Sequence, residues 1–115
     1  MPGSHKHTIE ELTHLVNNRH VNHLDKVFDD NVEKTENKKV AFSNIQEARE
    51  YYSMEHEANP SAQWKILDIQ QGEENNNTAH ATISYNNHVY NTTYTFNSNG
   101  KIQKINSQIQ QQQQQ

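Results

Sequence analysis

Histidines are the first residues of this sequence whose spacing could carry chemistry. Eight occur in 115 residues, and His20 and His23 stand three apart, a spacing that can place two imidazoles side by side on a helix. A metal site needs a third ligand, and Asp25, two residues after His23, would point to another side of that helix. His5 and His7 belong to a polar stretch with nothing to pack. We therefore predict no metal site, and no motif indicates a cofactor.

Two other histidines stand at the ends of predicted elements. His56 lies near the end of a predicted helix, where an imidazolium ion interacts favourably with the helix dipole, so we expect a capping role. His88 follows a predicted hairpin turn, on the face that carries several tyrosines. It could present a ring nitrogen at the rim of a pocket, or it could pack across the hairpin against Tyr85. Both interpretations of His88 stay open.

The aromatic side chains form the second candidate group. Tyr90 and Tyr94 stand on one face of a predicted strand, and Phe96 continues that face. Such a stripe is commonly plain core. If it borders a cavity instead, the phenol groups would be the polar points of an otherwise apolar wall, which is usual for a small-molecule site. On this hypothesis the ligand-binding residues are Tyr52, Trp64, His88, Tyr90 and Tyr94.

Three helices are predicted in the first half of the chain. The first begins with Thr8 as its N-cap and carries an apolar face of Ile9, Leu12, Leu15 and Val16. A second, short helix carries Leu24, Val27 and Phe28. It ends in the turn residues 29–31, and residues 32–40 are interpreted as a short edge strand. The third helix begins at a capping box of Ser43 and Gln46 and turns inward Ile45, Ala48, Tyr51 and Tyr52.

In the second half the apolar period changes from 3.6 residues to 2. Residues 64–69 form a strand with apolar side chains on both faces, and residues 79–85 alternate between apolar and polar. Asn86-Asn87 suits a two-residue turn with positive φ, so the hairpin pairs Tyr85 with His88. That register aligns Ile83 with Tyr90, Ala81 with Thr92 and Ala79 with Tyr94.

Asn99-Gly100 is a second hairpin signal, and Ile102 and Ile105 fall in the strand after it. The odd spacing of these two isoleucines places them on opposite faces unless a bulge intervenes. Together the elements predict an α+β domain, with three N-terminal helices packed on a curved antiparallel sheet.

Composition limits the classes of protein that the chain can belong to. Its length suits one domain, and Leu, Ile, Val and Phe make only 21 of 115 residues, so the core is lean. A net charge of −4 offers nothing to a phosphate backbone, so we predict no nucleic-acid partner. No stretch has the length of a membrane span and the start lacks a signal peptide, so we expect no membrane partner and a cytoplasmic protein. Cysteine is absent, which excludes disulfides and thiol chemistry.

The ends of the chain differ in composition from its middle. Residues 1–7 cannot pack, and we interpret them as disordered or derived from expression. Residues 8–108 form the predicted domain. Residues 109–115 are a glutamine tail with nothing to bury.

Three segments resemble the nuclear-transport-factor-2-like superfamily, which includes SnoaL-like proteins and has a cystatin-like α+β cone. Residues 27–32 resemble its apolar-Asp-Asp turn, and residues 42–52 are similar to the helix that closes its cone. Residues 96–102 look like its aromatic-turn-Gly-Lys-Ile hairpin. Ser43-Asn44 stand where the family usually has Gly at the start of the third helix, and Asn can adopt the same backbone conformation.

The resemblance implies a cone-shaped pocket for a small apolar or cyclic ligand. Steroid-isomerase-like members have a proton-abstracting Asp near the position where this chain has Lys34, and lysine cannot act as the same low-pKa carboxylate base. The first hypothesis is therefore a small-molecule-binding domain, with a SnoaL-like lyase, isomerase or hydrolase activity as its catalytic form. The alternative is a non-catalytic homodimeric interaction module. A homodimer would pair through the polar face of the sheet, which carries His80, Thr82, Ser84, Val89, Asn91 and Thr93.

Overall fold

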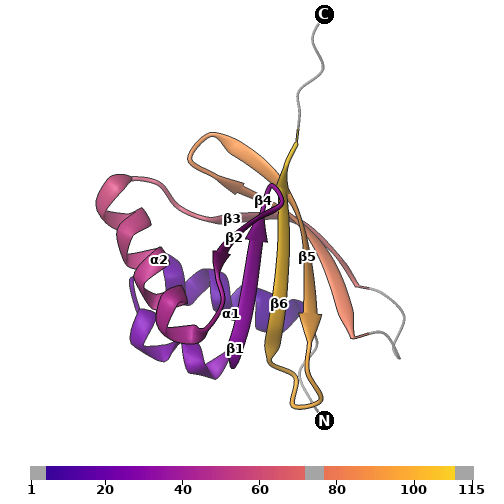
Figure 1. Ribbon diagram of the computed structural model, residues 1–115. Coiled ribbons are helices and arrows are strands. Elements are labelled where there is room, and N and C mark those ends of the chain that lie inside the picture. The colour runs from indigo at the N-terminus through magenta and orange to yellow at the C-terminus, as the bar shows by residue number, and fades with distance from the viewer. Residues whose placement is uncertain (1–4, 72–76, 111–115) are drawn as a thin grey trace, which may run out of the picture.

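The computed structural model describes residues 5–71 and 77–110. In chain order its elements are helix α1 (His5–Asn17), 3-10 helix η1 (Val21–Lys26), strands β1 (Phe28–Glu36) and β2 (Lys39–Phe42), helix α2 (Ile45–Ala58), and strands β3 (Lys65–Gln71), β4 (Thr78–Tyr85), β5 (His88–Phe96) and β6 (Ile102–Ile109). The six strands form one sheet in the order β2-β1-β6-β5-β4-β3 (Figure 1). Most of the polar loop at 72–77 and the glutamine run from 111 onward lie outside the described residues.

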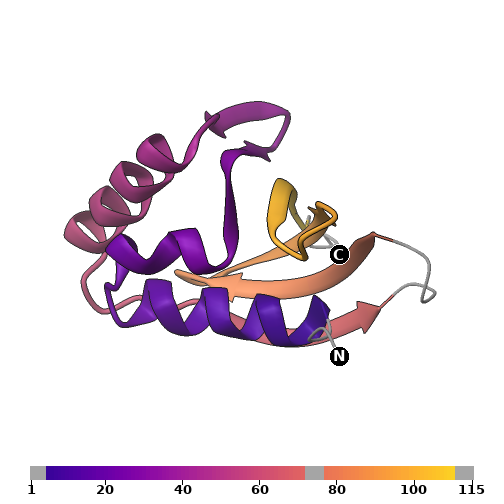
Figure 2. The same cartoon turned by 90° about the horizontal axis from the view of Figure 1, so that it is seen from below.

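The helices cover one face of a curved sheet. Helix α1 packs along β3 and β4, whereas α2 packs on β1 and β2, so that together they span the concave side (Figure 2). The α+β architecture is confirmed, but the order of elements is only partly as predicted. Two helical segments precede the first strand, and α2 follows the β1-β2 hairpin. No helix within residues 5–71 and 77–110 is long and apolar enough to cross a membrane.

The sheet is mixed, which corrects the prediction of a purely antiparallel sheet. Strand β1 runs parallel to β6, while every other neighbouring pair among the described strands is antiparallel. The segment that forms β1 was predicted as the end of a helix, a turn and an edge strand. Leu24, Val27 and Phe28 follow a helical period, but the 3-10 helix ends at Lys26 and Phe28 already belongs to β1.

The physical reason for this error lies in a strand irregularity. Asp29, Asp30 and Asn31 interrupt the apolar alternation and look like turn residues, and the register between β1 and β6 shifts between Phe28 and Glu33. A parallel partner from the far end of the chain supplies the pairing that a local pattern does not reveal.

The hairpin of β4 and β5 has the predicted register, with Tyr85 opposite His88 and Ala79 opposite Tyr94. Asn86 and Asn87 have φ angles of 51° and 69°, as the two-residue turn requires. A bulge intervenes in the next hairpin, because the register shifts between Thr95 and Phe96. It brings both Ile102 and Ile105 into the core.

Two helix starts differ from the predicted positions. Helix α1 begins at His5 rather than after Thr8, and the His5 ring stacks on Phe96 at a centroid distance of 3.8 Å. Helix α2 is capped by Asn44, whose side chain accepts from the Glu47 N–H, so the predicted box of Ser43 and Gln46 is displaced by one residue. Ser43 still takes part, because its N–H and hydroxyl both donate to the Glu47 carboxylate.

Candidate functional site

A cavity opens between α1 and the concave face of the sheet. Its volume is small, about 30 Å³. Aliphatic, aromatic and hydroxyl side chains from both layers surround one cationic side chain. The lining residues are Leu12, Thr13, Val16, Lys34, Tyr52, Trp64, Ile83, Tyr90, Thr92, Tyr94, Ile105 and Ser107.

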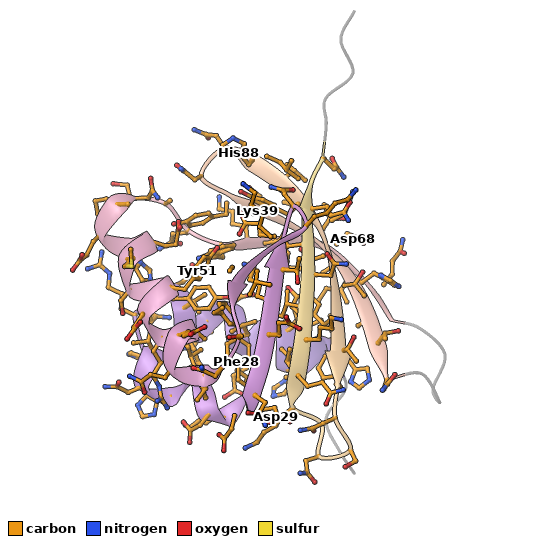
Figure 3. The ribbon with its side chains drawn as sticks, viewed as in Figure 1. Phe28, Asp29, Lys39, Tyr51, Asp68 and His88 are labelled. Atoms are coloured by element: carbon orange, nitrogen blue, oxygen red, sulfur yellow. The ribbon has the colours of Figure 1, made fainter. Side chains whose placement is uncertain are left out.

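Four of the five candidate ligand-binding residues border this cavity: Tyr52, Trp64, Tyr90 and Tyr94. The fifth, His88, does not. It is exposed at the turn of the β4-β5 hairpin, with its Nδ1 atom 3.0 Å from the carbonyl oxygen of Asn86 (Figure 3). Its ring lies 6.4 Å from Tyr90, so it contacts the outer end of the aromatic stripe without reaching the cavity.

The side chain at the centre of the site is Lys34 of β1. Only 4% of this residue is exposed, and its amine lies over three aromatic rings. The distances from Nζ to the ring centroids are 4.9 Å for Tyr51, 5.7 Å for Tyr52 and 5.0 Å for Trp64. Such contacts attract a cation, but less strongly than water solvates an ammonium ion.

Burial therefore controls the charge of Lys34. Loss of water lowers the pKa of its amine to about 8, although the carboxylates of Glu36 and Glu55 act in the opposite direction. The same loss of water raises the pKa of the tyrosines at the site, Tyr52 and Tyr94 most clearly among those that line the cavity. The site thus combines neutral phenols with an amine that changes protonation near pH 8.

Tyr51 of α2 connects the lysine to a carboxylate. The Lys34 amine donates to the Tyr51 hydroxyl at 3.4 Å, and that hydroxyl donates to Glu36 Oε1 at 2.9 Å. The direct distance from Lys34 Nζ to the same oxygen is 3.9 Å. Figure 3 shows Tyr51 reaching from α2 toward the sheet. The Glu36 side chain is 29% exposed, so the three groups form a hydrogen-bonded path from the cavity to solvent.

Trp64 is held in place by a residue that the sequence analysis did not identify. Asn17, the last residue of α1, donates through Nδ2 to the Trp64 carbonyl and accepts from the Trp64 N–H, both at 2.8 Å. The indole stacks on Tyr85 at 3.8 Å and meets the Tyr52 ring edge-on at 5.8 Å. These contacts fix the indole of Trp64, the residue directly before β3.

Two hydroxyl groups line the cavity on strands β5 and β6, beside the strand that carries the amine. Thr92 of β5 and Ser107 of β6 are both buried, and their hydroxyl oxygens are 3.4 Å apart. They are neighbours because the two residues pair across the β5-β6 hairpin. The cavity therefore contains one amine and the hydroxyl groups of Thr92 and Ser107 among apolar and aromatic side chains.

The histidines contribute elsewhere. The rings of His20 and His23 are 5.9 Å apart, and no group of three His, Asp or Glu residues among those described is arranged to hold a metal ion. His56 differs from the expected helix cap, since its ring is buried and its Nε2 contacts the Val16 carbonyl of α1. It therefore joins the two helices above the cavity.

Lys34 could have been identified from two signals. The first is that Val32 and Lys34 are both buried and stand two residues apart, which is the period of one face of a strand. This period indicates a buried lysine only if residues 28–36 are recognised as a strand. The second signal is the resemblance, which places Lys34 near the position of a catalytic acid in other proteins. Asn17 carried no signal, because its partner is 47 residues away.

Comparison with known proteins gives a fold. No family model and no curated protein matches this chain. A SnoaL-like polyketide cyclase from Agrobacterium tumefaciens superimposes with a TM-score of 0.78 at 12% identity, over 96% of this chain and 94% of that one. An NTF2-like protein of unknown function from Exiguobacterium gives 0.76 at 15% identity, over 91% and 99%.

A SnoaL-like protein of unknown function from Burkholderia thailandensis gives a TM-score of 0.79 at 8% identity, over 96% of this chain and 100% of that one. At these identities the similarity concerns the backbone and not the residues of a site. The chain therefore has the fold shared by SnoaL-like and nuclear-transport-factor-2-like proteins, as the resemblance of its sequence predicted.

Proposed function

We propose that this protein is a small-molecule-binding domain whose ligand enters the cavity around Lys34. The observation that carries the proposal is a buried amine that lines a cavity together with four aromatic side chains. A buried charge costs free energy unless it is paired, and the nearest carboxylate oxygen lies 3.9 Å away and is shared with Tyr51. Burial of the Lys34 amine does not help to stabilise so lean a core. A ligand with an electron-rich oxygen, however, would accept a hydrogen bond from this amine.

The lining defines the kind of ligand. Aromatic rings and the aliphatic side chains of Leu12, Ile83 and Ile105 favour a small, flat, apolar or cyclic molecule. At about 30 Å³ the cavity has room for about two water molecules, so even a ligand of one ring enters only if the mouth widens. An oxygen atom near Lys34 would accept a hydrogen bond from its amine. The hydroxyls of Thr92 and Ser107 would meet a second polar atom.

Tyr52, Trp64, Tyr90 and Tyr94 are the proposed contact residues of the ligand, and Lys34 joins them. His88 is not included, because it is exposed at the hairpin turn. A SnoaL-like polyketide cyclase of the same fold supports a catalytic form of the proposal, in which the pocket acts as a lyase, isomerase or hydrolase. The proposal itself rests on the cavity and does not require that activity.

The test uses Trp64, the only tryptophan of the chain, as its reporter. Benzamide is one flat ring with a hydrogen-bonding oxygen and does not react with amines under mild conditions. We expect it to change the fluorescence of Trp64 and to shift the indole resonance in nuclear magnetic resonance spectra. Native mass spectrometry of freshly purified protein would detect a ligand that co-purifies.

Two neighbouring residues provide matched variants. Ser107→Leu fills the cavity and should weaken binding of benzamide at least about tenfold, the effect of about 1.4 kcal/mol. Gln108→Leu changes the next residue, which is exposed, and should leave binding unchanged. The proposal would be contradicted if no molecule co-purifies with the protein and Trp64 does not respond to benzamide.

A homodimer that pairs through the outer face of the sheet remains a proposal as well. That face is partly polar, and a shallow depression on it is bordered by Asp68, Gln70, His80, Thr82, Asn91 and Thr93. The mass spectrum that tests for a ligand also gives the number of subunits. A monomer at all protein concentrations would contradict this part alone.

A further inference from the structure

We infer that the amine of Lys34 forms a Schiff base with an aldehyde or ketone that enters the cavity. The inference rests on the proposed function, because the carbonyl compound must first bind between the aromatic walls. It deepens that function by naming the substrate class and the atom that reacts. Lysine is the residue that forms such adducts with carbonyl compounds, and a desolvated site activates it.

The first support is the position of the amine. Lys34 lines the cavity, and its Nζ lies over the rings of Tyr51, Tyr52 and Trp64. The three rings come from α2 and from the residue before β3, so the side chain is enclosed by separate elements. An enclosed side chain has few rotamers, and the amine is therefore held where a bound carbonyl carbon could reach it.

The second support is the charge around the amine. Two carboxylates act on it, Glu36 from its own strand and Glu55 from α2. The other titratable groups around it are phenols, those of Tyr51 and Tyr52 beside the amine and those of Tyr90 and Tyr94 in the lining of the same cavity. Burial outweighs both carboxylates, and the pKa of Lys34 falls to about 8. At pH 8 about half of the amine is then neutral, roughly a hundredfold more than for an exposed lysine. Only the neutral amine has a lone pair to donate.

The third support is a path for protons. The ammonium form of Lys34 must lose a proton before nitrogen can attack, and this proton must leave an apolar site. The Lys34 amine donates to Tyr51, and Tyr51 donates to Glu36, which reaches solvent. Each hydrogen bond points outward, so a proton can pass from nitrogen to water along them.

The reaction balances without an oxidant or a reductant. The nitrogen lone pair forms a bond to the carbonyl carbon, the carbon–oxygen π electrons move to oxygen, and the proton lost by nitrogen is returned to that oxygen. The hydroxyl then takes a second proton and leaves as water, while nitrogen loses its remaining proton or keeps it as an iminium ion. Lysine and carbonyl compound thus give an imine and one water. Thr92 and Ser107 are the buried hydroxyls that could hold the leaving oxygen.

The wall of the cavity narrows the substrate class. A carbonyl group joined to an aromatic or unsaturated ring is flat and places its ring against Trp64 and Tyr52 while its carbon faces the amine. Benzaldehyde is the smallest probe with these properties. It is also the reactive counterpart of benzamide, since both have one ring and one carbonyl oxygen.

The experiment incubates the full chain with benzaldehyde and sodium cyanoborohydride at pH 8. Reduction of an imine adds the mass of benzaldehyde less one oxygen atom to the protein. Digestion and peptide mass spectrometry then locate each adduct, which is necessary because an amino terminus with an ordinary pKa of about 8 also reacts. We expect Lys34 to be modified at least about tenfold faster than the exposed Lys39. The rate at which Lys34 is modified should rise with pH, with a midpoint near pH 8.

Three comparisons separate a site from a merely reactive amine. Benzamide should slow modification of Lys34 and leave Lys39 unchanged. Ser107→Leu should slow it as well, whereas Gln108→Leu should not. Tyr51→Phe removes the first group of the proton path and should slow modification several-fold, while circular dichroism and binding of benzamide stay as in the wild type.

The two proposals fail in different ways. If benzamide binds but Lys34 is modified no faster than Lys39, the pocket exists and the Schiff base is wrong. If modification of Lys34 is fast but is unaffected by benzamide and by Ser107→Leu, the amine reacts outside a binding site and the inference is again overturned. If benzamide does not bind and Lys34 gives no adduct, both the inference and the proposed function fail.

Discussion

The two walls of the cavity are built by different kinds of contact. The hairpin wall consists of Ile83 of β4 and of Tyr90 and Tyr94 of β5, with Ile83 opposite Tyr90. All three are close in sequence. The lysine wall consists of Lys34, Tyr52 and Trp64, with Tyr51 behind them against the amine. These residues come from β1, α2 and the residue before β3. A local turn sets the hairpin wall, whereas the lysine wall exists only when distant segments have assembled.

This difference also separates the chemistry of the two walls. The hairpin wall is a surface of rings and aliphatic groups that recognises shape. The lysine wall carries the buried charge, the path Lys34–Tyr51–Glu36 and the anchored indole. The proposed reactivity therefore lies on the side that depends on long-range structure, where the polar groups can be enclosed from several directions.

The largest expected effect tests whether the hairpin wall also acts as core. Tyr94 is buried, and Tyr94→Ala should reduce the free energy of unfolding by about 3–5 kcal/mol, the usual cost of removing a large buried ring. Tyr94→Phe keeps the ring and should cost less than about 1 kcal/mol. Urea unfolding of both variants measures the difference. Equal stability of the two variants would show that the ring of Tyr94 packs against nothing.

The second prediction addresses the lysine wall. Asn17→Ala leaves the backbone N–H and carbonyl of Trp64 without partners, which should cost about 2 kcal/mol. It should also shift the emission of Trp64, because the indole loses its anchor. Asn18→Ala is the control, since Asn18 follows the last residue of α1, is exposed, and bonds through its side chain to His14 of that helix. If Asn17→Ala has the same Trp64 emission and the same stability as Asn18→Ala, Trp64 is positioned by its ring contacts alone.

The third prediction concerns the turn between β5 and β6. Gly100 has a φ of +81° and open space around its missing side chain, so Gly100→Val meets no steric obstacle other than its own backbone. The cost should be about 1–2 kcal/mol, the penalty of a β-branched residue in the left-handed region. Gly100→Asn should be milder, because Asn tolerates that region. Thermal unfolding compares them, and a wild-type midpoint for Gly100→Val would mean that the turn rearranges without strain.

Sequence alone predicted the parts of the molecule that local patterns govern. The register of β4 and β5 and the positive φ of Asn86 and Asn87 follow from period-2 alternation and turn chemistry. The odd spacing of Ile102 and Ile105 left open whether a bulge intervenes, and the structure has one. These placed Tyr90 and Tyr94 on the inner face. The resemblance in three short segments predicted the fold. Two of these segments prove to be in contact, because Asn97 donates to Asp29 at 2.9 Å.

Sequence alone missed what depends on non-local pairing. A strand that pairs in parallel with the far end of the chain has no turn signal of its own, and Asp29–Asn31 imitated a helix end. For that reason Lys34 was recognised as a departure from a family position but not as the centre of the site. Asn17 looked like an ordinary polar residue at a helix end, since only its three-dimensional contact with Trp64 gives it a role.

The last prediction uses the protonation of Lys34 to compare the two walls. The pKa of the amine is about 8 in the folded protein and returns to its ordinary value of 10.5 on unfolding. Between these values the unfolded chain binds more protons than the folded one, so stability rises with pH. From pH 7 to pH 9 the gain should be about 1 kcal/mol. Measurement stops at pH 9, because unfolded tyrosines begin to ionise above it while the folded ones, whose pKa values are raised, do not.

Lys34→Met supplies the matched comparison, since it keeps an unbranched side chain that ends at the ε position and removes the titrating group. The gain between pH 7 and pH 9 should vanish in this variant and persist in Tyr94→Phe, which changes only the hairpin wall. Lys39→Met, which changes an exposed lysine of β2, should keep the gain as well. If the wild type and Lys34→Met respond identically to pH, the amine of Lys34 is solvated in the folded protein. The lysine wall would then lose the neutral amine on which its proposed chemistry depends.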